Sequence, residues 1–166
     1  MLLTNPITIF EFDKNTDISN WLVVDDVVMG GRSNGNFTLN EKGNGHFYGE
    51  VSTENNGGFS SLRYRFEPIN VDKFTKIKIR LKGDKKQYQF RIKSDVSQRH
   101  AYISNFQTSG DWETIELNLE DLYPTFRGVE LDMPNFSNDT IEQIAFLIAN
   151  KKDESFSLEI EKIELE

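Results

Sequence analysis

A period-two alternation of apolar and polar side chains runs through most of this sequence and limits what it can fold into. In residues 75–83, Ile77, Ile79 and Leu81 lie on one side of an extended chain, and the basic residues between them lie on the other. Successive side chains of a β-strand point to opposite faces. The segment therefore predicts a strand with one buried and one solvated face.

Similar segments recur along the chain. We predict further strands at residues 7–12, 21–24, 35–39, 45–52, 59–66, 87–93, 100–106, 112–119, 144–149 and 156–165. Turns rich in Asn-Gly pairs separate several of them, and helix is limited to single turns near residues 120–123 and 138–143. This pattern favours an all-β fold, a jelly-roll β-sandwich of two antiparallel sheets. The length of 166 residues suits one domain, so we predict a single domain over residues 1–166.

Two features predict details of the topology. A Gly-Asp-Lys-Lys turn at residues 83–86 separates the strands at 75–83 and 87–93, which predicts an antiparallel hairpin. That hairpin would gather the basic residues of both strands on one cationic face, although such a row is usually only a solvated surface. In the last strand the apolar residues change phase between Ile160 and Ile163, which predicts a β-bulge.

The bulk composition excludes several classes of function. The formal net charge of −8 disfavours duplex nucleic acid as a partner, and the lack of cysteine excludes thiol catalysis and cysteine-based zinc sites. No apolar run approaches the roughly 20 residues of a membrane-spanning helix, so we predict no membrane insertion. The first residues lack a secretory or mitochondrial targeting pattern. We therefore predict a cytoplasmic, bacterial protein.

The motifs of common catalytic sites are also missing. The sequence has no phosphate-binding loop, no His-Glu-x-x-His motif and no Gly-x-Ser-x-Gly motif. Its two histidines, His46 and His100, are isolated, and we predict that both lie at the surface or rim. We predict a non-enzymatic protein without a cofactor. A structural calcium ion between the first and last strands is an alternative that stays open. Its candidate ligands are Glu11, Asp13, Asp17 and Glu161.

Two glycine-rich segments are candidates for a binding site. In the first, Asp25 and Asp26 precede a double glycine at residues 30–31. These carboxylates could line a polar pocket, or they could only accept turn hydrogen bonds with Arg32 or Arg63 as an internal ion partner. In the second, Gly57 and Gly58 open onto a strand with Phe59, Ser61 and Arg63 on one side. An aromatic ring beside guanidinium groups can hold a planar or sugar-like ligand, and an ordinary solvated strand face is the alternative.

A third segment, Phe126-Arg127-Gly128, could bring Arg127 to the same rim or use it to hold backbone carbonyls. Together with Arg91 on the strand at 87–93, these segments define a predicted site for a ligand or partner. Its residues are Asp25, Asp26, Gly57, Gly58, Phe59, Arg63, Arg91 and Arg127.

These segments together resemble the complex I intermediate-associated protein family, of the thirty-kilodalton type. The resemblance rests on Asp-Asp-Val-Val-Met-Gly-Gly-Arg-Ser at residues 25–33 and Asn-Asn-Gly-Gly-Phe-Ser-Ser-Leu-Arg at residues 55–63. It also includes Leu-Lys-Gly-Asp at residues 81–84, Tyr-Gln-Phe-Arg at residues 88–91, and Trp112 followed by Phe126-Arg127-Gly128.

The resemblance implies a galactose-binding-domain-like jelly roll related to carbohydrate-binding modules. Mitochondrial members of the family are assembly factors for NADH:ubiquinone oxidoreductase and are not known for a catalytic activity. Two departures limit the transfer to this chain. The organelle role does not carry over directly because a mitochondrial presequence is missing. Residues 117–119 read Leu-Asn-Leu where the family tends to have proline and phenylalanine, so the local rim geometry is expected to differ.

Three functional hypotheses follow, in decreasing order of support. The first is a binding or assembly module that contacts a protein partner, in a bacterium a respiratory-chain or other multi-subunit complex. The second is a carbohydrate-binding module with Phe59, Tyr88 or Tyr102 as exposed platforms. The third is an enzyme with Asp25 and Asp26 as acid and base, which is disfavoured because adjacent residues of a strand point to opposite faces.

Overall fold

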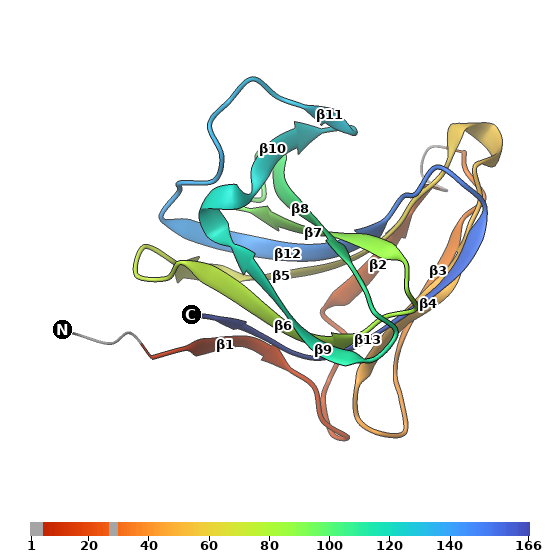
Figure 1. Cartoon of the computed structure of the whole chain (residues 1–166), viewed down its shortest axis with the longest axis horizontal. Helices are drawn as coiled ribbons and strands as arrows, with labels where there is room; N and C mark the ends of the chain where they lie inside the picture. The colour runs from red at the N-terminus through yellow and green to blue at the C-terminus, as the bar shows by residue number, and fades with distance from the viewer. Residues whose placement is uncertain (1–4, 27–29) are drawn as a thin grey trace.

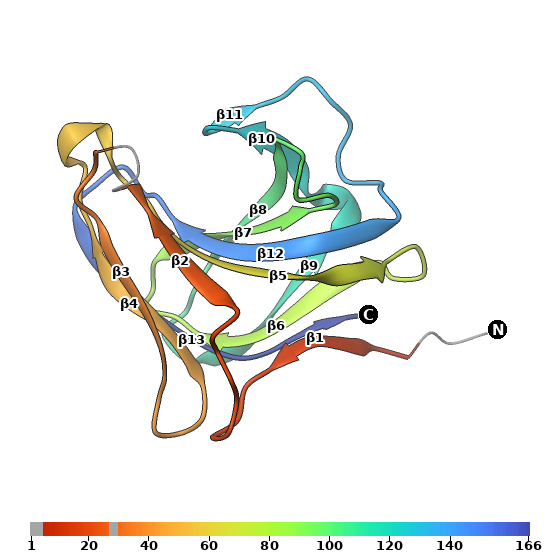
Figure 2. The ribbon, with the colours of Figure 1, turned by 180° about the vertical axis from the view of Figure 1, so that it is seen from behind.

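The computed structural model describes residues 5–26 and 30–166, which form two antiparallel β-sheets packed face to face (Figures 1 and 2). The lower sheet of Figure 1 contains β1 (Ile7–Glu11), β3 (Asn34–Leu39), β4 (Gly45–Val51), β6 (Lys76–Lys82), β9 (Trp112–Asn118) and β13 (Glu154–Leu165). The upper sheet contains β2 (Trp21–Asp25), β5 (Ser60–Asn70), β7 (Gln87–Lys93), β8 (Ala101–Gln107), β10 (Tyr123–Phe126), β11 (Val129–Glu130) and β12 (Thr140–Ile148). Two single 3₁₀ turns, η2 (Glu54–Asn56) and η3 (Leu119–Asp121), complete the described elements.

The strand orders confirm the prediction of an all-β jelly-roll sandwich. The lower sheet has the order β3-β4-β13-β6-β9, with β1 also paired to β13, and the upper sheet has the order β11-β10-β8-β7-β12-β5-β2. Neighbouring strands in both sheets come from distant parts of the sequence, as in β12, which lies between β5 and β7. Within the described part of the chain, no helix has the length and apolar character needed to cross a bilayer.

The long strand β13 organises the lower sheet. Its first part pairs with β4 and its last part with β1, while β6 lies along its other edge. The register with β6 shifts between Ile160 and Lys162, which confirms the predicted bulge. The bulge lets Phe156, Leu158 and Ile160 and, after the phase change, Ile163 and Leu165 all reach the core.

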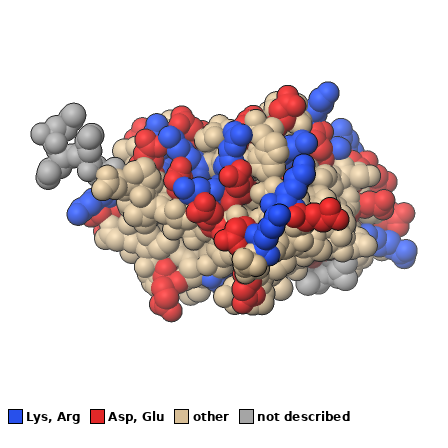
Figure 3. Space-filling model, turned by 90° about the horizontal axis from the view of Figure 1, so that it is seen from below, with Lys and Arg blue, Asp and Glu red and all other residues tan. Residues whose placement is uncertain are grey.

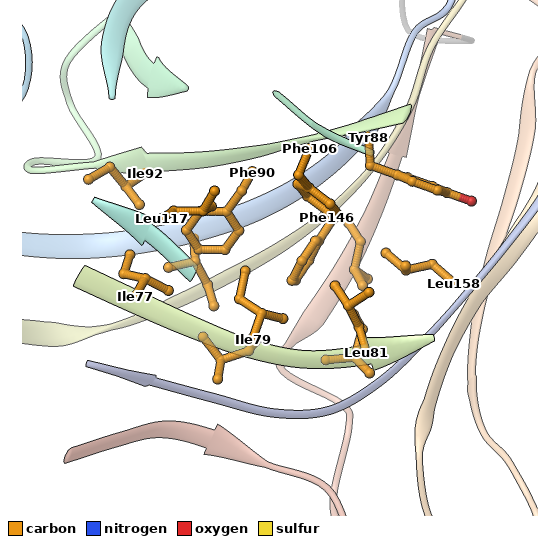
Figure 4. Close-up of a cluster of buried hydrophobic side chains, with 14 of the residues drawn as sticks. Ile77, Ile79, Leu81, Tyr88, Phe90, Ile92, Phe106, Leu117, Phe146 and Leu158 are labelled. Carbon is orange, nitrogen blue, oxygen red and sulfur yellow. The ribbon is translucent and has the colours of Figure 1, made fainter. Parts of the chain in front are cut away.

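Alternation along the strands builds the core between the sheets. Ile77, Ile79 and Leu81 of β6 rise from the lower sheet toward Phe90 of β7 and Phe146 of β12 in the upper sheet (Figure 4). All five side chains are fully buried, and the two phenylalanine rings pack at 5.3 Å between centroids in an edge-to-face arrangement. The predicted buried face of residues 75–83 is therefore confirmed.

The predicted hairpin between residues 75–83 and 87–93 is wrong. Strand β6 lies in the lower sheet and β7 in the upper sheet, so residues 83–86 cross between the layers. The crossing is anchored by Asp84, which accepts hydrogen bonds from the Tyr88 hydroxyl and from the Ser157 backbone N–H, each at 2.9 Å. Alternation alone does not decide between a hairpin and two strands in opposite sheets. The apolar faces of two strands are buried equally well when the strands pair in one sheet and when they face each other across the core.

The prediction of single helical turns was half correct. A 3₁₀ turn at Leu119–Asp121 confirms the first, with a shift of one residue. The second, at residues 138–143, is wrong because Thr140 begins β12. The register with β5 shifts between Ile141 and Gln143, so Ile141 and Ile144 both face the core although they are three residues apart. This spacing imitates the helical period.

The core position of Phe146 predicts a large effect of truncation. Replacing Phe146 with Ala should lower the free energy of unfolding by about 3–5 kcal/mol, because it removes apolar contacts and leaves a cavity. Urea unfolding followed by tryptophan fluorescence measures the change. The control is Leu22→Ala, since Leu22 is 61% exposed and should change stability by less than about 0.5 kcal/mol. Similar losses for both variants would contradict the assignment of Phe146 to the core.

Candidate functional site

A pocket with a volume of about 560 Å³ opens on the face of the upper sheet that is turned away from the core. The sheet curls so that β10 and β11 stand over β7 and β12 (Figures 1 and 2). The walls of the pocket come from β5, β7, β8 and β12, from the end of β10 and from residues that adjoin these strands. The lining residues are Phe59, Ser61, Arg63, Gln89, Arg91, Ile92, Lys93, Arg99, Ala101, Phe126, Arg127, Gly128, Gln143, Ala145, Leu147 and Ala149.

Cross-strand pairing arranges the floor of this pocket in rows. In the middle row, Ala145 of β12 pairs with Arg63 of β5 on one side and with Arg91 of β7 on the other. Strands lie about 4.8 Å apart, so the two arginine backbones are roughly 10 Å apart with only a methyl group between them. The space above Ala145 lets both guanidinium groups reach a single ligand.

The row on one side is uncharged, and the row on the other side carries two more basic residues. Leu147 lies between Ser61 and Gln89, and Gln143 lies between Arg65 and Lys93. Although Ala145 and Leu147 point away from the core, they are only 3% and 6% exposed. The floor is therefore recessed, because the longer side chains of β5 and β7 stand around it.

Positive charge dominates the pocket. The basic side chains in its wall are Arg63, Arg91, Lys93, Arg99 and Arg127, and within residues 5–26 and 30–166 no carboxylate lines it. The remaining segments, 1–4 and 27–29, contain no Asp or Glu. The ion pairs among the described residues all involve other groups. The pocket thus concentrates positive charge in a chain whose net charge is −8.

The pKa shifts of the basic side chains follow from their burial and from this concentration of charge. Burial lowers the pKa of Arg63 and Arg91, and a neighbouring guanidinium lowers each further, that of Arg65 for Arg63 and that of Arg63 for Arg91. Burial and the same arginines lower the pKa of Lys93. An arginine nevertheless stays protonated near neutral pH. The pocket therefore keeps its charge and stabilises an anion that enters it.

Two of the basic groups near the floor are already oriented by the protein. The Lys93 ammonium donates to the carbonyl oxygen of Gln98 at 2.8 Å, and the Arg65 guanidinium donates to Gln143 Oε1 at 2.9 Å. The described hydrogen bonds do not include the guanidinium groups of Arg63 and Arg91. Their donors therefore remain for a ligand.

The aromatic residues of the site are fewer than predicted. Phe59 lines the pocket, and the guanidinium of Arg127 lies over the ring of Phe126 at 5.2 Å. The prediction of Tyr88 and Tyr102 as exposed platforms is wrong, because their exposed fractions are 1% and 5% and both belong to the core. Each lies on the core-facing parity of its strand.

The structure separates the predicted site residues into two groups. Phe59, Arg63, Arg91 and Arg127 line one pocket. Asp25, Asp26, Gly57 and Gly58 lie outside its lining. The sequence prediction missed Lys93, Arg99, Gln143 and the small residues at the floor. The alternation that identified Arg91 would also have placed Lys93 and Gln89 beside it.

Asp26 holds two loops together from inside the protein. Its buried carboxylate accepts hydrogen bonds from Ser33 Oγ at 2.6 Å, from the Ser33 backbone N–H at 2.9 Å, and from the backbone N–H groups of Gly58 and Phe59 at 2.6 and 3.2 Å. A Cβ on Gly31 or Gly57 would lie 2.4 Å from this carboxylate, so glycine is required at both positions. Burial tends to raise the pKa of Asp26, but these hydrogen bonds outweigh it and lower the pKa.

Asp25 has a comparable internal role. Its carboxylate accepts a hydrogen bond from the Gly35 backbone N–H at 2.8 Å and one from the Ser60 hydroxyl. It thereby ties the start of β3 to the start of β5. The alternative interpretation of this motif, carboxylates that accept hydrogen bonds from turns and loops, describes both aspartates. Its ion-pair part is wrong, because Arg32 lies 3.5 Å from Glu54 and Arg63 lines the pocket.

The basic row of β6 differs from the pocket because acids pair with two of its lysines. Lys78 pairs with Glu116 at 3.5 Å and with Glu166 at 2.5 Å, and Lys76 lies 3.9 Å from Glu116. The guanidinium of Arg80 lies over the ring of Trp112 at 5.9 Å. Figure 3, a view from below in which the lower sheet faces the reader, shows Lys and Arg interleaved with Asp and Glu. The predicted joint cationic face with Arg91 and Lys93 is wrong because β7 lies in the other sheet.

The remaining candidates are not part of the pocket lining. His46 is hydrogen-bonded to Ser157 Oγ at 2.8 Å, and His100 lies 3.3 Å from the hydroxyl of Tyr102. Of the proposed calcium ligands, Asp13 and Glu161 line a shallow depression together with Lys14, Lys42 and Arg80. Across the described ranges, no three His, Asp or Glu residues gather in a metal-binding group.

Asp26 gives a prediction about stability. Asp26→Asn should lower the free energy of unfolding at pH 7 by about 3 kcal/mol, because the neutral amide replaces an acceptor of charge-assisted hydrogen bonds. The pKa of Asp26 is lower in the folded than in the unfolded chain, so its ionisation stabilises the fold above the unfolded pKa. This contribution is lost as the pH falls through the folded pKa.

Urea unfolding at about pH 7 and about pH 3 should therefore show the gap between wild type and Asp26→Asn narrowing in acid. Asp72→Asn, at an exposed turn position, is the matched control and should have little effect. A wild-type value for Asp26→Asn at pH 7 would contradict the role given to this carboxylate.

Comparison with solved structures places the fold among carbohydrate-binding modules. The family 11 carbohydrate-binding module of the cellulosomal cellulase Lic26A-Cel5E of Clostridium thermocellum matches with a TM-score of 0.72 and 18% identity, over 99% of this chain and 95% of that one. The family 11 module from the same organism in complex with a β-1,3-1,4-mixed-linked tetrasaccharide matches with a TM-score of 0.68 and 19% identity, over 93% and 94% of the two chains. An agarase, AgWH50C, matches 98% of this chain with 24% of its own, with a TM-score of 0.63 and 11% identity.

At these identities the likeness shows the fold alone. The family relationship comes from the sequence itself, and it confirms the resemblance drawn from the Asp-Asp and Asn-Gly-Gly segments. The family model of complex I intermediate-associated protein 30 (CIA30) matches residues 10–160, so this chain belongs to the CIA30 family.

Proposed function

We propose that this protein is a non-enzymatic binding or assembly module that contacts a protein partner through the pocket of the upper sheet. The observation that carries the proposal is the gathering of Phe59, Arg63, Arg91 and Arg127 around one open, recessed pocket. Arginine and aromatic side chains dominate the binding energy of many protein interfaces. The family name points to the partner class, a multi-subunit respiratory complex or its assembly intermediates.

The chemistry of the pocket supports binding over catalysis. Its titratable side chains are four arginines, which hold their protons near neutral pH, and Lys93. The hydroxyl of Ser61, at the floor, is committed to the carbonyl oxygen of Val24 at 2.7 Å. Asp25 and Asp26, the candidates for an acid–base pair, accept hydrogen bonds from separate loops and support the fold. The basic side chains of the pocket are suited to hold an anion in place.

A carbohydrate-binding role is the second candidate, and the fold favours it. The family 11 module described above was solved with a mixed-linked tetrasaccharide, and a pocket of about 560 Å³ can hold a small sugar. Against it, Phe59 is the only predicted platform that lines the pocket, since Tyr88 and Tyr102 are buried. Isothermal titration with that tetrasaccharide tests the alternative, which requires saturable binding that Phe59→Ala weakens.

Filling the pocket should abolish partner binding. In Ala145→Phe, the new ring would occupy the space between Arg63 and Arg91 while the core face of β12 stays unchanged. Affinity capture from cells that carry the native gene, read by quantitative mass spectrometry, should recover subunits of a respiratory complex with the wild type. Their recovery should fall at least about tenfold with Ala145→Phe.

The matched control is Thr114→Phe, which adds the same ring at an exposed position of β9 in the other sheet. It should recover the same subunits as the wild type. Equal recovery with wild type and Ala145→Phe, when both variants unfold at wild-type urea concentrations, would refute the assignment of the pocket as the contact surface.

A further inference from the structure

Rows of basic residues lie on outward-facing strand surfaces of both sheets, and they differ in the acids that stand beside them. On β6, Lys76 and Lys78 are paired with Glu116 and Glu166 of neighbouring segments. In the pocket, the strand between Arg63 and Arg91 offers Ala145, a residue without charge. The described part of the chain places no carboxylate in the pocket wall. This difference needs an explanation, because like charges that lie close together repel.

The repulsion is not relieved by loss of protons. Burial and neighbouring guanidinium groups lower the pKa of Arg63 and Arg91, yet arginine stays charged near neutral pH. A recessed site with two unneutralised guanidinium groups is stabilised when an anion enters it, and the surroundings screen this attraction less than bulk water does. The planar forks of two arginines match the geometry of a carboxylate.

We propose that this pocket binds an acidic peptide segment of the partner protein, with an Asp or Glu carboxylate of that segment held between Arg63 and Arg91. The inference rests on the proposed function and adds the chemical class that the pocket recognises. The floor beside the arginines is apolar at Ala145 and Leu147, and Phe59 stands at the wall. The segment therefore carries an apolar side chain next to its acidic one.

A peptide fits these residues better than an acidic sugar. Sugar rings usually stack on exposed aromatic faces, but here the guanidinium of Arg127 already covers the ring of Phe126, and Tyr88 and Tyr102 are buried. A mixture of apolar floor and basic wall suits alternating apolar and acidic side chains. The whole chain has a net charge of −8 although the pocket is basic, so the surface outside the pocket repels acidic segments and directs them to the pocket.

Fluorescence anisotropy with the complete chain tests the proposal. The probes are the fluorescein-labelled peptide Gly-Glu-Leu-Glu-Gly and its counterpart Gly-Gln-Leu-Gln-Gly. We expect the Glu peptide to bind at least about tenfold more tightly than the Gln peptide, and its affinity to fall as salt is added. Arg63→Gln and Arg91→Gln should each weaken binding of the Glu peptide about tenfold or more.

The matched control is Arg80→Gln, which removes the same charge from β6 in the other sheet and should leave the affinity unchanged. Urea unfolding confirms that all variants are folded. Equal affinity for the two peptides, or wild-type affinity in Arg63→Gln and Arg91→Gln, would overturn the proposal. Tighter, arginine-dependent binding of oligogalacturonate would also overturn it, because the ligand would then be an acidic sugar.

The double variant Arg63→Gln, Arg91→Gln separates this proposal from the broader one in the affinity capture described above. If it retains the partner that Ala145→Phe loses, the pocket is the contact surface but the acidic segment is not what it recognises. If both variants lose the partner, both proposals are supported. If both retain it, the pocket is not the contact surface.

Discussion

The alternation of side chains along β5, β7 and β12 is the constraint on which both the core and the pocket depend. In β12, Ile144, Phe146 and Ile148 enter the core, while Ala145 and Leu147 form the floor of the pocket. A slip of β12 by one residue would exchange its two sets, and a slip of β5 or β7 would bring the guanidinium group of Arg63 or Arg91 into the core. Burial of unpaired charge is costly. The packing that stabilises the sandwich therefore also fixes Arg63 and Arg91 on either side of Ala145.

The most distinctive sequence motifs lie outside the pocket and hold the loop that carries one of its residues. The carboxylate of Asp26 binds the loop at Ser33 to the loop at Gly58 and Phe59. Of these residues, Phe59 lines the pocket. Glycine at positions 31 and 57 leaves room for that carboxylate. The Asp-Asp and Gly-Gly runs are therefore explained by a connection between loops, which sets the position of the adjacent aromatic ring. A motif that identifies a family need not be the surface that meets a ligand.

Residue patterns were sufficient for the layers of the fold and insufficient for its connections. Alternation at residues 75–83 and the phase change between Ile160 and Ile163 correctly predicted a half-buried strand and a bulge, because both depend on neighbours in sequence. The pairing of β6 with β13 and not with β7 depends on contacts between distant residues, such as the bond from the Ser157 N–H to Asp84. The start of β12 was hidden because a bulge placed Ile141 and Ile144 at helical spacing.

The same limit explains what could be predicted of the pocket. The sequence places Arg63 and Arg91 on outward-facing parities, but it does not tell which strand lies between them. The residues of that strand decide whether the charge of the arginines is neutralised. On β6, neighbouring acids neutralise lysines of similar pattern, whereas β12 places a small neutral residue between two arginines. Since basic rows that look alike in sequence differ only in their cross-strand neighbours, the charge available to a partner is a property of the pairing and not of the basic residues themselves.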